Sequence, residues 1–99
     1  MSTKVVHCKK QPYDVYIAHP SEWENPFSIG VDGDRWEVIR MFEEYLQRRI
    51  QNGAVSVERL AKLHGKKLGC WCYPDACHGE VLVAYAEWAY NQLNKKDAA

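Results

Sequence analysis

The chain has 99 residues, a length that predicts one domain over residues 1–99 with a single modest core. It carries 13 basic and 13 acidic residues, so its formal net charge at neutral pH is zero. That balance argues against duplex nucleic acid as a partner, because a protein that neutralises phosphates needs a basic surplus or patch.

The amino-terminal residues lack the features of a signal peptide, and no apolar run is long enough to cross a bilayer. We therefore expect a cytoplasmic protein without a membrane partner. In that compartment the four cysteines should stay reduced, which argues against a disulfide framework.

The first predicted elements are two short strands, over residues 4–8 and 13–17. Both stretches are rich in β-branched and aromatic residues, and Pro12 breaks the chain just before the second. Residues 18–27 then form a loop, since its prolines allow neither a strand nor a helix to continue. Loops that follow strands commonly carry binding residues. The candidates here, which supply donors, acceptors and a flat ring, are His19, Ser21, Trp23 and Asn25. The alternative for Trp23 is a hydrophobic plug at the sheet edge.

Two helices are predicted next. Asp34 and Glu37 have the spacing of a capping box, which opens a helix that ends near Asn52. Ser56 can cap a second, shorter helix over residues 57–63. The apolar residues expected to face inward on the first helix are Ile39, Phe42, Leu46 and Ile50.

A third strand over residues 68–72 leads through a turn into a last helix over residues 79–94. The chain as a whole therefore predicts an α/β fold. We expect a small Rossmann-like domain of two or three layers, with a short, mainly parallel sheet and about three helices.

The turn after the third strand gathers Cys70, Cys72, Cys77 and His78, for which three interpretations compete. Thiolates and imidazole are the ligands that zinc prefers, but adjacent or alternating residues are not the Cys-x-x-Cys pairs of structural zinc sites. Cys77 near a helix N-terminus could instead be a reactive thiol, with His78 as its acid or base. Cys70 fits a small core residue. We expect no cofactor, with zinc as the open alternative.

The start of the last helix is the predicted ligand site. The first N–H groups of a helix have no partner within it, so they attract phosphates and carboxylates, and Gly79 would let a ligand approach the backbone. The expected partner is thus a small anionic ligand held between this turn and the preceding loop. The predicted ligand-binding residues are His19, Pro20, Ser21, Trp23, Asn25, Pro26, Cys72, Pro74, Cys77, His78, Gly79 and Glu80.

The last helix also has more apolar surface than one small sheet can cover. Its main stripe is supplemented on other sides by Val81, Trp88 and Tyr90. We therefore expect a homodimer in which this helix or its neighbour packs across a two-fold axis.

Several segments together resemble one known family. They are Val5-Val6-His7, Tyr13-Asp14-Val15-Tyr16-Ile17, Trp23-x-Asn25-Pro26-Phe27 and Gly65-Lys66-x-Leu68-Gly69-Cys70-Trp71-Cys72-x-Pro74-x-x-Cys77-His78-Gly79. The chain resembles the small bacterial and phage proteins grouped as domain of unknown function 4326. The resemblance implies signature positions at Asn25, Pro26, Cys72, Pro74, Cys77, His78 and Gly79, and it is compatible with a phage gene. His19 and Glu24 stand where the family is expected to have Arg and Gly, so an anion contact there would shift to His19.

Three functions remain open at this point. The first is a binding module for a nucleotide-like or phosphosugar ligand, which in a phage could sequester a host signalling nucleotide. The second is an enzyme of nucleotide metabolism, a hydrolase or glycosyl-transferring activity, in which Cys77 or His78 reacts and Glu80 or Asp75 assists. The third is a protein–protein inhibitor whose Cys/His turn is only structural.

Overall fold

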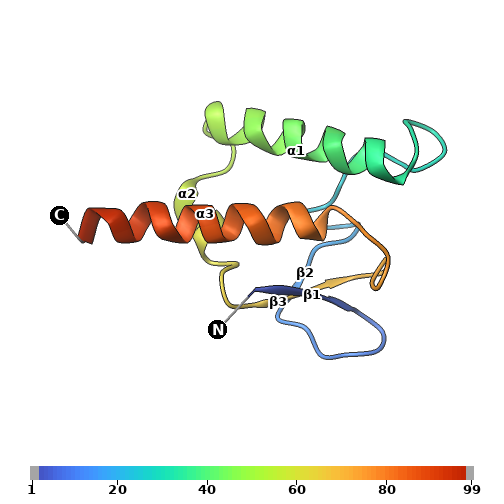
Figure 1. The fold of residues 1–99 in the computed structure, drawn as a ribbon, viewed down its shortest axis with the longest axis horizontal. Helices are drawn as coiled ribbons and strands as arrows, with labels where there is room; N and C mark the ends of the chain where they lie inside the picture. Colours follow the sequence, from blue (N-terminus) through green and yellow to red (C-terminus); the bar gives the residue numbers. More distant parts are fainter. Residues whose placement is uncertain (1–2, 98–99) are drawn as a thin grey trace.

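Residues 3–97, which are those that the computed structural model describes, contain a sheet of three short parallel strands. The strands are β1 (Lys4–His7), β2 (Val15–Tyr16) and β3 (Lys67–Cys70). β3 lies in the middle and pairs with β1 on one side and β2 on the other (Figure 1). In this register the fully buried Leu68 is the partner of both Val5 and Val15. The prediction of a short parallel sheet is confirmed.

All three strands are shorter than their sequence patterns predict. The predictions covered residues 4–8, 13–17 and 68–72, whereas β1 ends at His7, β2 has two residues and β3 ends at Cys70. Beyond Cys70 the chain bends, because the backbone N–H of Asp75 donates to the carbonyl oxygen of Cys72 at 2.8 Å and closes a turn. The residues after Cys70 therefore belong to a turn and not to the strand.

Three helices are present in the described part of the chain. They are α1 (Arg35–Gln51), α2 (Val57–Ala61) and α3 (Gly79–Asp97). α1 begins at the predicted capping box, in which the Asp34 and Glu37 carboxylates each accept the other residue's backbone N–H at 2.9 Å. The Ser56 hydroxyl caps α2 by accepting the N–H of Arg59. Within residues 3–97, no helix combines the length and the apolar character that crossing a bilayer requires.

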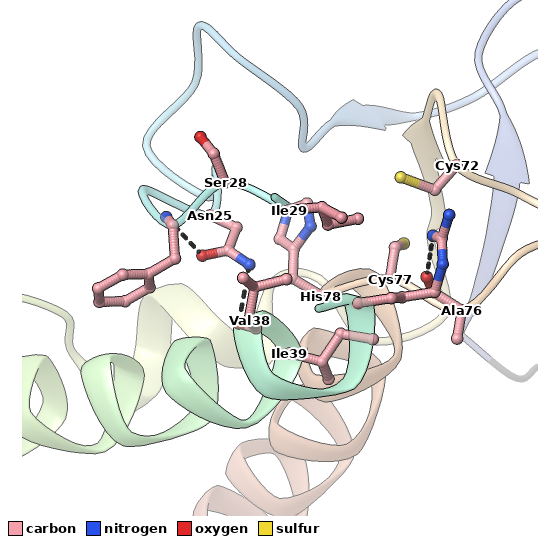
Figure 2. Close-up of a pocket in the computed structure, with 11 residues that line it drawn as sticks. Asn25, Ser28, Ile29, Val38, Ile39, Cys72, Ala76, Cys77 and His78 are labelled. Carbon is pink, nitrogen blue, oxygen red and sulfur yellow. Dashed lines mark hydrogen bonds between the residues drawn. The ribbon is translucent and has the colours of Figure 1, made fainter. Parts of the chain in front are cut away.

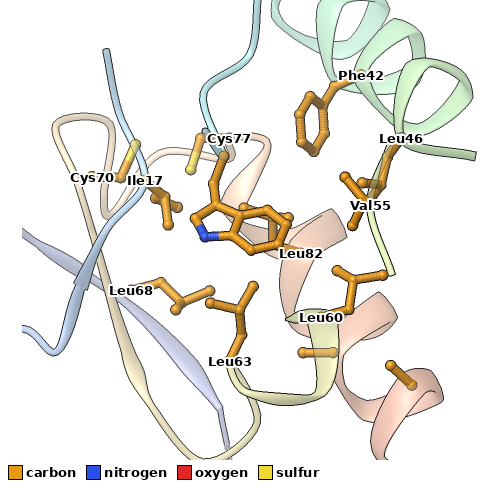
Figure 3. Close-up of a cluster of buried hydrophobic side chains, with 13 residues drawn as sticks. Ile17, Phe42, Leu46, Val55, Leu60, Leu63, Leu68, Cys70, Cys77 and Leu82 are labelled. Carbon is orange, nitrogen blue, oxygen red and sulfur yellow. The ribbon is translucent and has the colours of Figure 1, made fainter. Parts of the chain in front are cut away.

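The helices lie on one side of the sheet, with α3 next to the strands and α1 beyond it (Figure 1). The predicted α/β class is thus confirmed. The helices cover one face of the sheet (Figure 1). On α1 the buried residues are Val38, Phe42 and Leu46, whereas Ile39 and Ile50 are only half-buried. The core between helices and strands includes Ile17, Phe42, Leu46, Leu60, Leu68 and Leu82 (Figure 3).

Two glycines allow close contacts with the sheet. A Cβ atom on Gly69 would lie 2.6 Å from the ring of Tyr13, and one on Gly79 would lie 2.8 Å from Val5 and 2.9 Å from Ile17. Both distances are shorter than carbon atoms tolerate without movement. The buried Gly79 therefore lets the first turn of α3 rest on the sheet, which differs from our expectation that it opens the backbone to a ligand.

We predict that Gly79→Ala lowers the free energy of unfolding by about 1–2 kcal/mol, since overpacking outweighs the better helix propensity of Ala. The Ile17 side chain is fully buried, so it cannot easily move away from the added methyl group. Gly69→Ala should cost less, because the Tyr13 ring is 43% exposed and can turn towards solvent. Urea unfolding of both variants measures the difference. A Gly79→Ala protein as stable as the wild type would contradict this account of the packing.

Candidate functional site

Beyond the carboxyl ends of β2 and β3 lies a cavity of about 270 Å³, which we call the edge cavity (Figure 2). It is formed by the loop after β2, the first turns of α1 and the turn between β3 and α3. Its lining residues are Asn25, Phe27, Ser28, Ile29, Arg35, Val38, Ile39, Cys72, Ala76, Cys77 and His78. In α/β proteins ligands commonly bind at this edge of the sheet, where strands end and helices begin.

Asn25 holds the loop of the cavity in place. Its Nδ2 donates to the carbonyl oxygen of Val38 at 3.0 Å, and its Oδ1 accepts the backbone N–H of Phe27 at 3.0 Å (Figure 2). Both ends of the amide are therefore occupied by the chain itself. Asn25 shapes the cavity by joining the loop to α1.

His78 is the buried polar side chain of the cavity, with 7% of its surface exposed. Its Nε2 lies 2.9 Å from the carbonyl oxygen of Ile17, which only accepts, so Nε2 must carry a proton. The ring packs edge-on against Phe42, with 5.0 Å between ring centroids. Within the described residues Nδ1 has no hydrogen-bond partner, which leaves it available to a ligand.

Arg35 supplies the guanidinium of the cavity. Its Nη1 donates to the carbonyl oxygen of Ala76 at 2.8 Å, and its Nη2 lies 3.8 Å from the exposed carboxylate of Asp75. These contacts tie the first turn of α1 to the turn before α3. The remaining N–H donors of the guanidinium are available to an anion.

Cys70, Cys72 and Cys77 form what we call the thiol cluster, because their three sulfur atoms lie within 4.8 Å of one another. Such a set of sulfurs can hold a metal ion. Hydrogen bonding from the Cys77 thiol lowers the pKa of Cys70. The same hydrogen bond, together with burial, raises the pKa of Cys77 far above its usual value. Burial and the nearby Cys70 raise the pKa of Cys72, which the guanidinium of Arg35 opposes.

The first backbone N–H groups of α3 are occupied by the chain. The N–H of Gly79 donates to Cys77 Sγ at 3.3 Å, that of Glu80 to the Cys77 carbonyl at 3.2 Å, and that of Val81 to the His78 carbonyl at 3.0 Å. The expectation that these groups cradle an anion is therefore not supported by their geometry. The cation near the cavity is Arg35 instead.

The edge cavity brings together only part of the predicted site. The predicted residues that line it are Asn25, Cys72, Cys77 and His78. The predicted residues that do not line it are His19, Pro20, Ser21, Trp23, Pro26, Pro74, Gly79 and Glu80.

Local contacts explain why several predicted residues lie elsewhere. The exposed His19 bonds to Glu24 at 2.7 Å, which lowers the pKa of that carboxyl group. The Ser21 hydroxyl accepts a hydrogen bond from the backbone N–H of Trp23. The Trp23 ring is buried in the core, which agrees with the alternative that it is a hydrophobic plug. Glu80 lines a different cavity, of about 320 Å³, with Tyr73, Asp75 and Cys77 among its other lining residues.

Sequence reasoning missed Arg35, although one signal pointed to it. Arg35 is the first residue of α1, directly after the Asp34 cap, where the positive end of the helix dipole disfavours a cation. A basic residue in that place calls for a compensating contact, which the turn before α3 provides. No comparable sequence feature indicated that Phe27, Ile29 and Val38 line the cavity.

Residues 2–88 match the family described as "Domain of unknown function (DUF4326)". A protein of Enterobacteria phage T4, described as "Uncharacterized 12.4 kDa protein in nrdA-td intergenic region", is 36% identical over 95 residues. That alignment covers 95% of this chain and 82% of the phage protein. No solved structure shows significant similarity to the chain. The family match and the alignment with the phage relative each extend over most of the chain, so the protein belongs to the DUF4326 family.

Proposed function

We propose that the protein is a small-molecule binding module that holds a nucleotide-like or phosphosugar ligand in the edge cavity. The observation that carries this proposal is the guanidinium of Arg35 and the buried imidazole of His78 on the wall of a largely apolar cavity. Apolar walls with a few convergent polar groups are typical of small-molecule sites.

The lining suits both parts of such a ligand. Phe27, Ile29 and Val38 offer an apolar surface to a base or to the carbon skeleton of a sugar. Arg35 uses one N–H for the carbonyl oxygen of Ala76, and its other donors suit bidentate recognition of a phosphate. The volume of about 270 Å³ favours a mononucleotide or a sugar phosphate over a dinucleotide.

His78 supports selectivity for a donor on the ligand. Its Nε2–H donates to the Ile17 carbonyl, so Nδ1 is the ring nitrogen left to accept a hydrogen bond from a ligand. An exocyclic amine of a base or a sugar hydroxyl can donate to that atom. His78 would therefore favour ligands that carry such a donor over ligands that lack it.

The chemistry of Cys77, the candidate nucleophile, favours binding over turnover. A nucleophilic cysteine works as the thiolate, whereas hydrogen bonding and burial raise the pKa of Cys77. Glu80, the carboxylate considered as an assisting group, lies outside the edge cavity. In this proposal Cys77 and His78 form the wall of a binding site, and the ligand leaves unchanged. No zinc ion is needed for this binding.

The phage relative suggests a setting for the activity. A binding module encoded by a phage could sequester a host signalling nucleotide and so remove it from its receptor. We place this activity in the cytoplasm, where such nucleotides occur and where free cysteines like those of this chain persist.

A panel of nucleoside phosphates, cyclic nucleotides and sugar phosphates should include compounds that raise the melting temperature. A ligand at a hundredfold excess over its Kd stabilises the folded state by about 2.7 kcal/mol. In a domain of this size, 1 kcal/mol corresponds to about 4–8 °C. Arg35→Gln should weaken binding by about tenfold to a hundredfold, because a charge-assisted hydrogen bond contributes roughly 1.5–3 kcal/mol. Isothermal titration with the most stabilising compound gives the Kd values of the wild type and of Arg35→Gln.

Arg40→Gln is the matched control, because Arg40 lies on the same helix but contacts Glu44 on the exposed side. It should bind like the wild type. If no phosphate-bearing compound shifts the melting temperature, or if Arg35→Gln binds as tightly as Arg40→Gln, the edge cavity is not an anion site. The protein–protein inhibitor would then become the better hypothesis.

We also propose that the protein forms a homodimer through α3. The rings of Trp88 and Tyr90 are 41% and 42% exposed on this helix. Trp88 also lines a cavity of about 250 Å³ together with Val57 and Leu93. Light scattering at micromolar concentration should give twice the mass of one chain. Trp88→Glu should lower the measured mass to that of a single chain, because a charge buried in the interface opposes association. A wild-type protein with the mass of one chain would contradict the dimer.

A further inference from the structure

The thiol cluster has the spacing of a metal site. The sulfur atoms of Cys70, Cys72 and Cys77 lie within 4.8 Å of one another. Zinc–sulfur bonds of about 2.3 Å in a tetrahedral arrangement place two sulfurs about 3.8 Å apart. No pair of sulfurs therefore has to approach by more than about 1 Å, a movement that small side-chain rotations can supply.

Hydrogen-bond donors lie next to the sulfurs of the thiol cluster. The backbone N–H of Gly79 donates to Cys77 Sγ at 3.3 Å. Hydrogen bonds from the Cys77 thiol and from the backbone N–H of Cys72 lower the pKa of Cys70. The guanidinium of Arg35 opposes the rise that burial and the nearby Cys70 cause in the pKa of Cys72. A cysteine that only fills a core needs no such donors, whereas outer donors of this kind orient and stabilise metal ligands.

The fold removes the objection that the sequence raised against a metal. On the predicted strand, Cys70 and Cys72 lack the tight turn by which a Cys-x-x-Cys pair aims two sulfurs at one ion. β3 ends at Cys70, however, and Cys72 already belongs to the turn that the Asp75 N–H closes. The same turn returns the chain to Cys77 beside Cys70 (Figure 3). The three ligands thus come from the end of a strand, a turn and the residue two positions before α3.

We propose that Cys70, Cys72 and Cys77 bind a zinc ion through their sulfur atoms, with the fourth coordination position directed towards the edge cavity. Two of the three ligands, Cys72 and Cys77, line that cavity (Figure 2). A water molecule or a donor atom of a bound ligand can therefore complete the coordination. Three thiolates around Zn²⁺ leave one net negative charge, which the guanidinium of Arg35 offsets. The thiol protons pass to solvent as the metal binds.

The test is a metal titration of the full chain, reduced and freed of metal beforehand. Co²⁺ should bind one ion per chain and give a thiolate-to-cobalt charge-transfer band in the near ultraviolet, which Zn²⁺ should then remove by displacement. One equivalent of Zn²⁺ should also raise the melting temperature, and a chelator should reverse the rise. A folded wild-type protein that gives no charge-transfer band with Co²⁺ would overturn the proposal.

Two cysteine variants identify the ligands. Cys72→Ser should weaken Zn²⁺ binding by on the order of a hundredfold or more, and Cys72 is the safest of the three to replace because it is only half-buried. Cys8→Ser is the matched control, since Cys8 is also half-buried but lies outside the thiol cluster. Equal Zn²⁺ affinity in Cys72→Ser and Cys8→Ser would rule out this ligand set. The wild-type titration decides the question even where Cys72→Ser does not fold.

The metal and the nucleotide proposals fail independently. Nucleotide binding by the metal-free chain, without a cobalt charge-transfer band, would support the binding module and exclude the zinc site. A cobalt charge-transfer band without any nucleotide-induced shift in melting temperature would support the zinc site and contradict the binding module.

Discussion

The parallel pairing of β3 with a strand on each side is the constraint on which the rest of the structure depends. Because all strands of the described sheet run the same way, their carboxyl ends meet at one edge, and the chain must leave the sheet there each time. The loop after β2 and the turn after β3 are thus neighbours, although about 50 residues separate them. His78 joins the two by bonding to the Ile17 carbonyl just beyond β2. The edge cavity is a consequence of this strand direction.

Local signals predicted the elements whose ends are fixed by local contacts. Asp34, Glu37 and Ser56 begin α1 and α2 where their sequence patterns place them, since a helix cap joins residues two or three positions apart. The end of β3 had no comparable signal. Trp71 and Cys72 are compatible with a strand, and only the tertiary structure decides that the chain turns after Cys70.

The edge cavity lies at the turn where the ligand site was predicted, but the α3 N–H groups named in that prediction have partners within the chain. A helix N-terminus attracts anions only while its N–H groups lack partners, and here Cys77 and His78 supply those partners from within the chain. Sequence spacing does not show whether a residue two positions before a helix turns its side chain back onto the first N–H. Arg35, 41 residues before Ala76 in the chain, illustrates the same limit, because its role depends on a long-range contact.

The edge cavity and the thiol cluster share one wall, and this has a physical consequence for both proposals. The contacts that hold the turn between Cys72 and Cys77 include the Asp75–Cys72 hydrogen bond and those of the Arg35 guanidinium. A zinc ion that joined Cys70, Cys72 and Cys77 would fix the ends of this turn relative to β3. Fixing a binding surface before the ligand arrives reduces the entropy lost on binding and so increases affinity. The metal would then act on the ligand even without touching it, by holding in place the wall that Cys72, Ala76 and Cys77 contribute to the cavity.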